Sequence, residues 1–190
     1  ALGIMASQQA IIGANLRHVE MYTRRGLLSL LWHEPDGEAQ KVGVVMVGGA
    51  MGGMLGPGDS LFHVLGEQLV AQGIPSIRLS YRKPNDMDSC CVDTAAAVQL
   101  LVGSGADAVV VMGHSFGGAV AIRVAVGLSA MVCGVVTFAT QSAGCEIAGG
   151  LHSTPLLMFH GDNDSILPLE ASEVVRAIAG TGDLHVMYGD

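Results

Sequence analysis

The sequence predicts a single α/β domain, residues 1–190, with a mostly parallel sheet, an N-terminal antiparallel hairpin and helices on both faces. Short runs rich in β-branched residues alternate with segments of helical periodicity, which is typical of parallel strands joined by crossover helices. The chain has 190 residues, of which 50% are hydrophobic and 14% charged, so it can bury a large core. No linker, repeat or low-complexity tract divides it.

The order of the expected elements follows from these runs. A hairpin is expected from 17–23 and 27–33, and the later strands are expected at 41–47, 74–80, 108–112, 132–139, 155–160 and 184–188. Helices are expected at 60–72, 91–102, 116–128 and 169–179. Their inward faces are predicted from the spacing of apolar residues, namely Leu61, Leu65 and Leu69 in the first helix, and Ala171, Val174, Val175 and Ile178 in the last.

Composition excludes several classes of function. The net charge of −8, with nine Lys and Arg, argues against nucleic acid or an anionic membrane as a partner. No apolar run approaches the ~20 residues that a membrane span needs. The four cysteines form no C-x-x-C pair and no zinc-binding spacing, and we interpret them as reduced thiols of a cytoplasmic protein. No metal or organic cofactor is expected.

The most informative motif is Gly113-His114-Ser115-Phe116-Gly117, which fits G-x-S-x-G. An ordinary strand-to-helix turn can match these five residues, so the flanking segments matter. A buried strand is expected before the motif and a helix after it, as in a nucleophile elbow. In such a sharp turn a Cβ at either glycine would collide with neighbouring backbone. The Ser115 hydroxyl would then stand at a helix N-terminus, where negative charge is stabilised.

Together with the segment His160-Gly161-Asp162-Asn163-Asp164-Ser165-Ile166-Leu167-Pro168, this motif resembles a small α/β-hydrolase of the dienelactone-hydrolase-like type. The resemblance covers residues 40–190. Segments 47–50, 81–85 and 140–142 are similar to a subgroup of uncharacterised bacterial and plant hydrolases. Dienelactone hydrolase itself has a cysteine nucleophile, whereas this chain has Ser115, so the resemblance indicates the fold and not the substrate.

The resemblance implies the other catalytic parts. Asp164 would be the acid that orients a histidine, with Asp162 as the weaker candidate, although both could simply cap turns. The oxyanion hole would use the backbone N–H of Phe116 and that of Ala50, with Met51 as the alternate, in the glycine-rich loop 48–58. That loop contains neither a dinucleotide-binding nor a P-loop glycine pattern.

No histidine of the sequence stands where the fold expects the catalytic base. That place is the loop after the last strand, which begins at Gly189-Asp190. We therefore expect that the sequence is truncated and that the base, followed by a final helix, lies just beyond Asp190. Each of the seven histidines that are present is interpreted as packed or solvated.

Three further residues are candidates for substrate contact. Arg82 could hold a substrate carboxylate, or it could be solvated or salt-bridged. Gln141 could line the pocket or cap its own loop. Met51 is a third candidate. Residues 139–155 leave little room for a lid, so the site is expected to be open.

These observations predict a serine hydrolase that cleaves a small carboxylic ester or thioester through an acyl-enzyme on Ser115. Two alternatives remain open, a non-catalytic binding or interaction module of the same fold and an acyltransferase. The sequence fits either a monomer or a homodimer.

Overall fold

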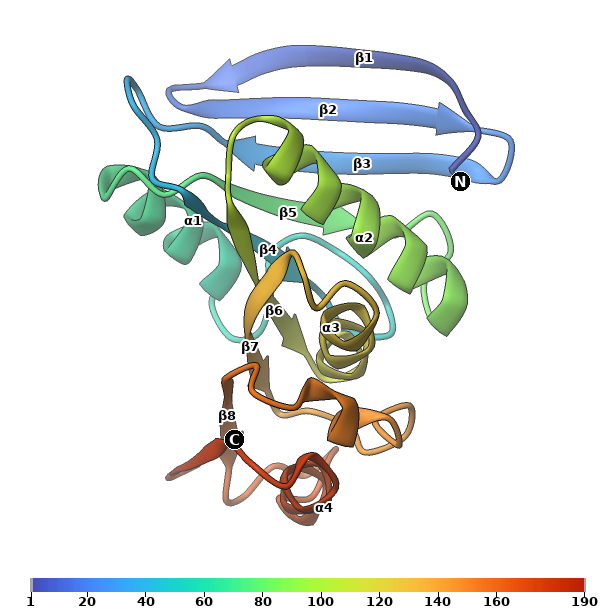
Figure 1. The fold of residues 1–190 in the computed structure, drawn as a ribbon, viewed down its shortest axis with the longest axis vertical. Helices are drawn as coiled ribbons and strands as arrows, with labels where there is room; N and C mark the ends of the chain where they lie inside the picture. The colour runs from blue at the N-terminus through green and yellow to red at the C-terminus, as the bar shows by residue number, and fades with distance from the viewer. Residues whose placement is uncertain (1, 190) are drawn as a thin grey trace.

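A computed structural model describes residues 2–189 and shows one mixed sheet flanked by helices (Figure 1). Within these residues nine strands lie in the order β1-β2-β3-β5-β4-β6-β7-β8-β9. The strands are β1 (Ile4–Gly13), β2 (Leu16–Thr23), β3 (Gly26–His33), β4 (Val42–Val47), β5 (Ser76–Ser80), β6 (Ala108–His114), β7 (Val132–Phe138), β8 (Leu156–Gly161) and β9 (Asp183–Met187). The helices are α1 (Leu61–Ala71), α2 (Met87–Gly103), α3 (Phe116–Gly127) and α4 (Glu170–Ala179), with a 3₁₀ turn, η1 (Ala148–Leu151).

The predicted fold class is confirmed. Strands β1 to β3 are antiparallel, β3 joins β5 antiparallel, and all pairs from β5 through β4 to β9 are parallel. Between β7 and β8 the chain forms only the short η1, so no lid is inserted there. None of the helices within residues 2–189 has the length and apolar character needed to cross a bilayer.

The sequence analysis did not identify β1, which adds a third strand to the predicted hairpin. All ten of its residues are exposed, and it pairs with β2 alone. A strand that buries neither face has no reason to alternate apolar and polar residues, so the period-two signal is missing from its sequence.

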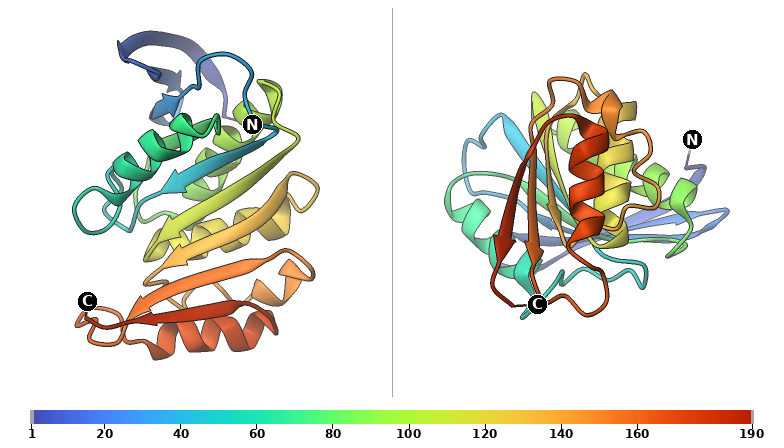
Figure 2. Two further views of the ribbon diagram at one scale, coloured as in Figure 1. Left: turned by 90° about the vertical axis from the view of Figure 1, so that its left-hand side faces the viewer. Right: turned by 90° about the horizontal axis from the view of Figure 1, so that it is seen from below.

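The helices form two layers on the sheet. Helix α1 lies on one face, and α2, α3 and α4 lie on the other (Figure 1, Figure 2). Alternate residues of β4 show the two layers, because Val45 and Val47 belong to the large core under α2 and α3, whereas Val44 and Met46 pack with Phe62 of α1. The parallel strands are therefore apolar on both faces, which explains their continuous hydrophobic runs.

The predicted inward face of one helix needs correction. In α4, Val175 is buried as expected, but Val174 and Ile178 are exposed, and the buried positions beside it are Ser172 and Ala179. The small side chains of Ser172 and Ala179 allow a closer approach of the helix than branched residues would. Spacing alone could not reveal this, since a small buried residue contributes little to an apolar pattern.

In α1 the fully buried residues are Phe62 and Gly66, while the predicted Leu61, Leu65 and Leu69 are half-buried. Gly66 packs directly on the buried ring of His33, and a Cβ there would lie 2.5 to 2.8 Å from three ring atoms. The glycine therefore sets how closely α1 approaches β3.

Replacing Gly66 by alanine tests this contact. Overpacking against the His33 ring is expected to lower the free energy of unfolding by about 1–3 kcal/mol, although alanine favours helix. Gly127→Ala is the matched control, because a Cβ at that helical glycine meets nothing within 4 Å. Urea unfolding of both variants measures the difference, and equal stability of the two would contradict the packing.

Candidate active site

Ser115 occupies a strained turn between β6 and α3. Its φ of 54° and ψ of −117° are unfavourable for a residue with a Cβ, at a cost of about 1–3 kcal/mol. Backbone hydrogen bonds hold the turn, since Ser115 N donates to Phe138 O at 2.9 Å and Ser115 O accepts from Gly118 N at 3.0 Å. The turn places Ser115 at the N-terminus of a twelve-residue helix.

The glycines of the motif have the steric role that the sequence predicted. A Cβ on Gly113 would overlap the backbone of Gly117, and a Cβ on Gly117 would overlap the carbonyls of Val47 and Gly48. The start of α3 therefore lies against both β6 and the end of β4. The predicted strand–turn–helix geometry around Ser115 is present, whereas its role as a nucleophile stays a prediction.

The glycine-rich loop 48–58 begins beside Ser115. A Cβ on Gly49 would lie 3.6 Å from the Ser115 Cβ and 3.5 Å from His114 Nδ1. The next residue, Ala50, is half-buried and packs on the core, while the Met51 side chain is 93% exposed. The loop backbone at Gly49, next to Ala50, therefore lies beside the Ser115 turn. The Met51 side chain points into solvent.

Buried side chains hydrogen-bond to the backbone of this loop at two positions. At its start the Tyr81 hydroxyl donates to Gly48 O at 3.2 Å, and near its end Arg78 Nη1 donates to Met54 O at 3.1 Å. Arg78 is 2% exposed, and its Nε also donates to His33 Nε2 at 3.0 Å. The His33 ring must therefore accept through Nε2 and remain neutral. Burial, aided by the charge of Arg78, lowers the pKa of His33 to about 4.

Asp164 follows β8 at the same edge of the sheet. Its Oδ1 accepts from Ile166 N at 2.8 Å and Leu167 N at 2.9 Å. Partial burial raises the pKa of the Asp164 carboxyl, but these two N–H groups outweigh it and leave the pKa below its ordinary value. The carboxylate is therefore ionised at neutral pH. Asp162, by contrast, is exposed and accepts only from Gly189 N, at 2.8 Å.

His160 has the packing role expected for it. Its Nδ1 accepts from the Ser172 hydroxyl at 2.6 Å, and its Nε2 donates to Leu167 O at 2.9 Å. Both ring nitrogens are thus engaged, and the residue is 1% exposed. The ring thus packs against the loop that contains Asp164, and its Nε2 lies 3.6 Å from Asp164 Oδ2.

A cleft of about 620 Å³ opens at the carboxyl ends of the strands, between the start of α1 and the Asp164 loop. His114 and Asp164 line it together with apolar side chains that include Leu61, Val64, Phe138, Phe159, Ile166 and Met187. In Figure 2, strands β7 to β9, orange to red, have no helix of the described chain over them on this side. Open α/β sheets bind ligands at this edge.

The sequence analysis did not place His114 in this cleft. Burial lowers the pKa of His114, and the charge of Asp164 opposes that change, so the two side chains interact electrostatically. Its position inside the G-x-S-x-G motif was the available signal, since the residue before Ser115 must lie at the same sheet edge. Within residues 2–189 no histidine is hydrogen-bonded to the Ser115 hydroxyl. The base predicted beyond Asp190 lies outside the described residues.

The remaining substrate candidates have structural partners. Arg82 Nε contacts Asp93 Oδ1 at 2.5 Å, and the Arg82 side chain is 5% exposed, so it is salt-bridged and does not line the Asp164 cleft. Gln141 Nε2 donates to Ala143 O at 2.7 Å and caps its own loop. No cluster of three or more His, Cys, Asp or Glu side chains in the described part of the chain is placed to hold a metal ion.

Comparison with solved structures decides the fold family. An α/β serine hydrolase homologue from Coxiella burnetii superposes with a TM-score of 0.73 at 19% identity, over 95% of this chain and 90% of the other. The chain has the α/β-hydrolase fold. Dienelactone hydrolase from Anabaena variabilis gives a TM-score of 0.76 at 15% identity, over 92% and 87% of the two chains.

A cold-adapted esterase from an Arctic intertidal metagenomic library, bound to PEG, gives a TM-score of 0.77 at 14% identity, over 96% and 88% of the two chains. The resemblance to dienelactone-hydrolase-like proteins is therefore confirmed at the level of the α/β-hydrolase fold. No protein-family model and no curated protein sequence matches the chain.

The depressed pKa of His33 predicts how stability depends on pH. The unfolded state binds a proton near the ordinary pKa of about 6.5, whereas folded His33 does so only near 4. The contribution of His33 to the free energy of unfolding is therefore fully present above pH 6.5, and it is lost as the pH falls toward 4. In His33→Gln this slope should be smaller by up to about 1.4 kcal/mol per pH unit, measured by urea unfolding from pH 7 to 4.5.

His152→Gln serves as the control, because His152 is exposed. It should keep the wild-type slope. A His33→Gln slope equal to that of wild type would show that folding does not lower the pKa of His33.

Proposed function

We propose that this protein is a serine hydrolase that cleaves a small carboxylic ester or thioester through an acyl-enzyme on Ser115. The observation that carries the proposal is the strained Ser115 turn at a helix N-terminus, with the Gly49-Ala50 backbone beside it. The ionised Asp164 carboxylate at the same sheet edge and the esterases among the structural neighbours support it.

In this mechanism the Ser115 Oγ attacks the substrate carbonyl and gives up its proton to a base. The backbone N–H groups of Phe116 and Ala50, with Met51 as the alternate, stabilise the oxyanion, and the dipole of α3 adds to them. The tetrahedral intermediate collapses, the C–O or C–S bond breaks, and the base returns the proton to the leaving alcohol or thiol. Water then attacks the acyl-enzyme in the same way and releases the acid.

The proposal assigns the base to a histidine that follows Asp190, oriented by Asp164. Hydrogen bonds along the last described residues support this position. Met187 O accepts from Asp162 N at 2.9 Å, and Gly189 O accepts from Asn163 N at 3.1 Å. The chain thus leaves β9 along the Asp164 loop, so a residue after Asp190 would emerge close to the Asp164 carboxylate.

The proposal includes no metal or organic cofactor, since the acyl-transfer chemistry needs only the groups named above. All four cysteines are free, which suits the reduced, cytoplasmic environment that we propose.

One observation favours a second function, a binding module of the same fold. Within the described residues no histidine is hydrogen-bonded to the Ser115 hydroxyl, and a serine without a base is a weak nucleophile. A full-length protein that binds a ligand in the Asp164 cleft but hydrolyses no ester would support this alternative.

Ser115→Ala tests the nucleophile. With p-nitrophenyl acetate and the full-length protein, kcat should fall at least about 1000-fold, while the free energy of unfolding changes by less than about 0.5 kcal/mol. Ser142→Ala, in the loop after β7, is the control and should keep wild-type activity. Full esterase activity in the Ser115 variant would reject the assignment.

Asp164→Asn tests the acid. The amide oxygen can still accept from Ile166 and Leu167, so the loop should stay folded, but the lost charge should lower kcat by about 1000- to 10,000-fold. Asp162→Asn keeps the acceptor for Gly189 N and should change kcat only a few-fold. If the Asp162 variant lost activity and the Asp164 variant did not, the roles of the two carboxylates would be reversed.

A further inference from the structure

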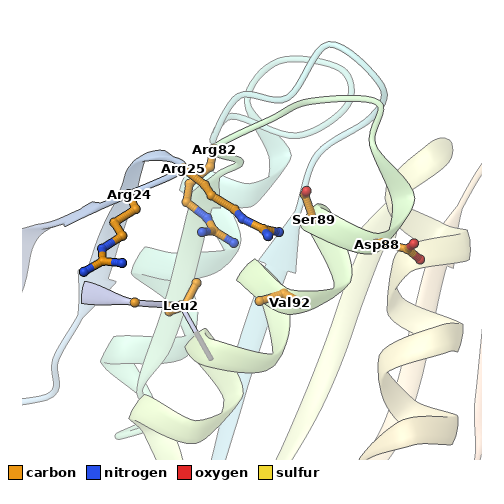
Figure 3. Close-up of a pocket in the computed structure, with 8 residues that line it drawn as sticks. Leu2, Arg24, Arg25, Arg82, Asp88, Ser89 and Val92 are labelled. Atoms are coloured by element: carbon orange, nitrogen blue, oxygen red, sulfur yellow. The ribbon is translucent and has the colours of Figure 1, made fainter. Parts of the chain in front are cut away.

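A second pocket, of about 400 Å³, lies away from the Asp164 cleft, where the turn between β2 and β3 meets the start of α2 (Figure 3). Its walls come from four segments of the chain. The lining residues are Leu2, Gly3, Arg24, Arg25, Arg82, Asp88, Ser89 and Val92. Three of the nine Lys and Arg residues of a chain with net charge −8 therefore converge on one small pocket.

Arg82 forms the fixed part of this pocket. Its Nε and backbone N contact the two oxygens of Asp93, which is fully buried, and its Nη1 donates to Thr23 Oγ1 at 3.3 Å. Among residues 2–189, no side chain or backbone group accepts from the second terminal nitrogen, Nη2, or from the remaining N–H of Nη1. The guanidinium is thus held in place while part of its donor set faces the pocket.

Thr23 couples the turn to Arg82. Its hydroxyl donates to Gly26 O at 2.7 Å and accepts from Arg25 N at 3.1 Å as well as from Arg82. A Cβ on Gly26 would lie 3.6 Å from both Arg82 Cβ and Arg82 O, so the turn packs directly on Arg82. Arg24 and Arg25 therefore lie on a turn that these contacts hold in a fixed position relative to Arg82.

The positive charge of this pocket is only partly balanced. Among residues 2–189, neither Arg24 nor Arg25 forms a salt bridge, and both are exposed. Figure 3 shows the guanidinium groups of Arg25 and Arg82 side by side, with the Asp88 carboxylate directed away from them. Like charges at close range repel each other, and an anion between them would remove the repulsion.

We propose that this pocket binds a small organic anion that carries a phosphate monoester or carboxylate group. Guanidinium groups present paired N–H donors that match the oxygens of either group. The Ser89 hydroxyl lies in the same pocket and adds a further hydrogen-bonding group. Leu2 and Val92 provide an apolar wall, and the volume suits a small molecule better than a bare ion.

The proposal does not depend on hydrolysis at Ser115. The sequence left Arg82 either as a contact for a substrate carboxylate or as a salt-bridged residue, and the structure shows it paired with Asp93 and lining this separate pocket. The anion would be a ligand bound apart from the reacting ester.

Calorimetric titration of the full-length protein with phenyl phosphate and with benzoate tests the site, with phenol as the neutral control. At low salt, at least one anion should bind saturably with a Kd below about 1 mM, and phenol should not. The compound with the lower Kd, phenyl phosphate or benzoate, shows whether the pocket prefers a phosphate or a carboxylate. Raising the salt concentration should weaken the binding, since Arg24 and Arg25 are exposed to solvent.

Arg25→Gln and Arg24→Gln should each preserve the melting temperature, and Arg25→Gln should weaken binding at least tenfold. Arg176→Gln, which changes an exposed arginine on α4, should bind as wild type does. The Arg25 variant separates this pocket from the Asp164 cleft, where benzoate could bind as a hydrolysis product, because Arg25 does not line that cleft. No saturable binding of either anion up to 10-fold above the expected Kd of about 1 mM, or unchanged binding in Arg25→Gln, would overturn the proposal.

Discussion

The close packing of α3 against β6 and β4 is the constraint on which the candidate active site depends. No Cβ fits at Gly113, Gly117 or Gly118, where the helix meets the backbone of the strands and the side chain of Thr140. The strain at Ser115 persists because this packing leaves the turn no alternative. Burial of the first half of α3 stabilises this arrangement. The buried residues include Ala119, Val120, Ala121 and Ile122. The half-buried Ser115 is thus held by the packing of α3 in the core.

The groups around Ser115 are held by buried polar contacts beneath them. Tyr81 and Arg78 fix the glycine-rich loop through Gly48 and Met54, and His160 supports the loop that carries Asp164. Such contacts fix the backbone of the loop, and a fixed backbone is what the proposed oxyanion hole requires. Three buried side chains, in β5, directly after it and in β8, therefore hold the backbone of these two loops in place.

The order of strands and helices could be predicted because the parallel strands are buried on both faces, and their sequences are therefore continuous apolar runs. The turn at Ser115 could be predicted because only glycine fits beside it. Strand β1 could not, since its residues are exposed on both faces, and the inward face of α4 was misjudged because Ser172 and Ala179 are small. The proximity of His114 to Asp164, and the ion pair of Arg82 with Asp93, join residues 50 and 11 positions apart and depend on tertiary structure.

The central claim is that the fold activates Ser115 as a nucleophile. The most direct measurement is the intact mass of the full-length protein after treatment with a fluorophosphonate, followed by peptide mapping. An activated serine should give a single phosphonyl adduct located on Ser115, formed at neutral pH while the other serines stay unmodified. A folded protein that gains no adduct, or one labelled at another serine, would contradict the account.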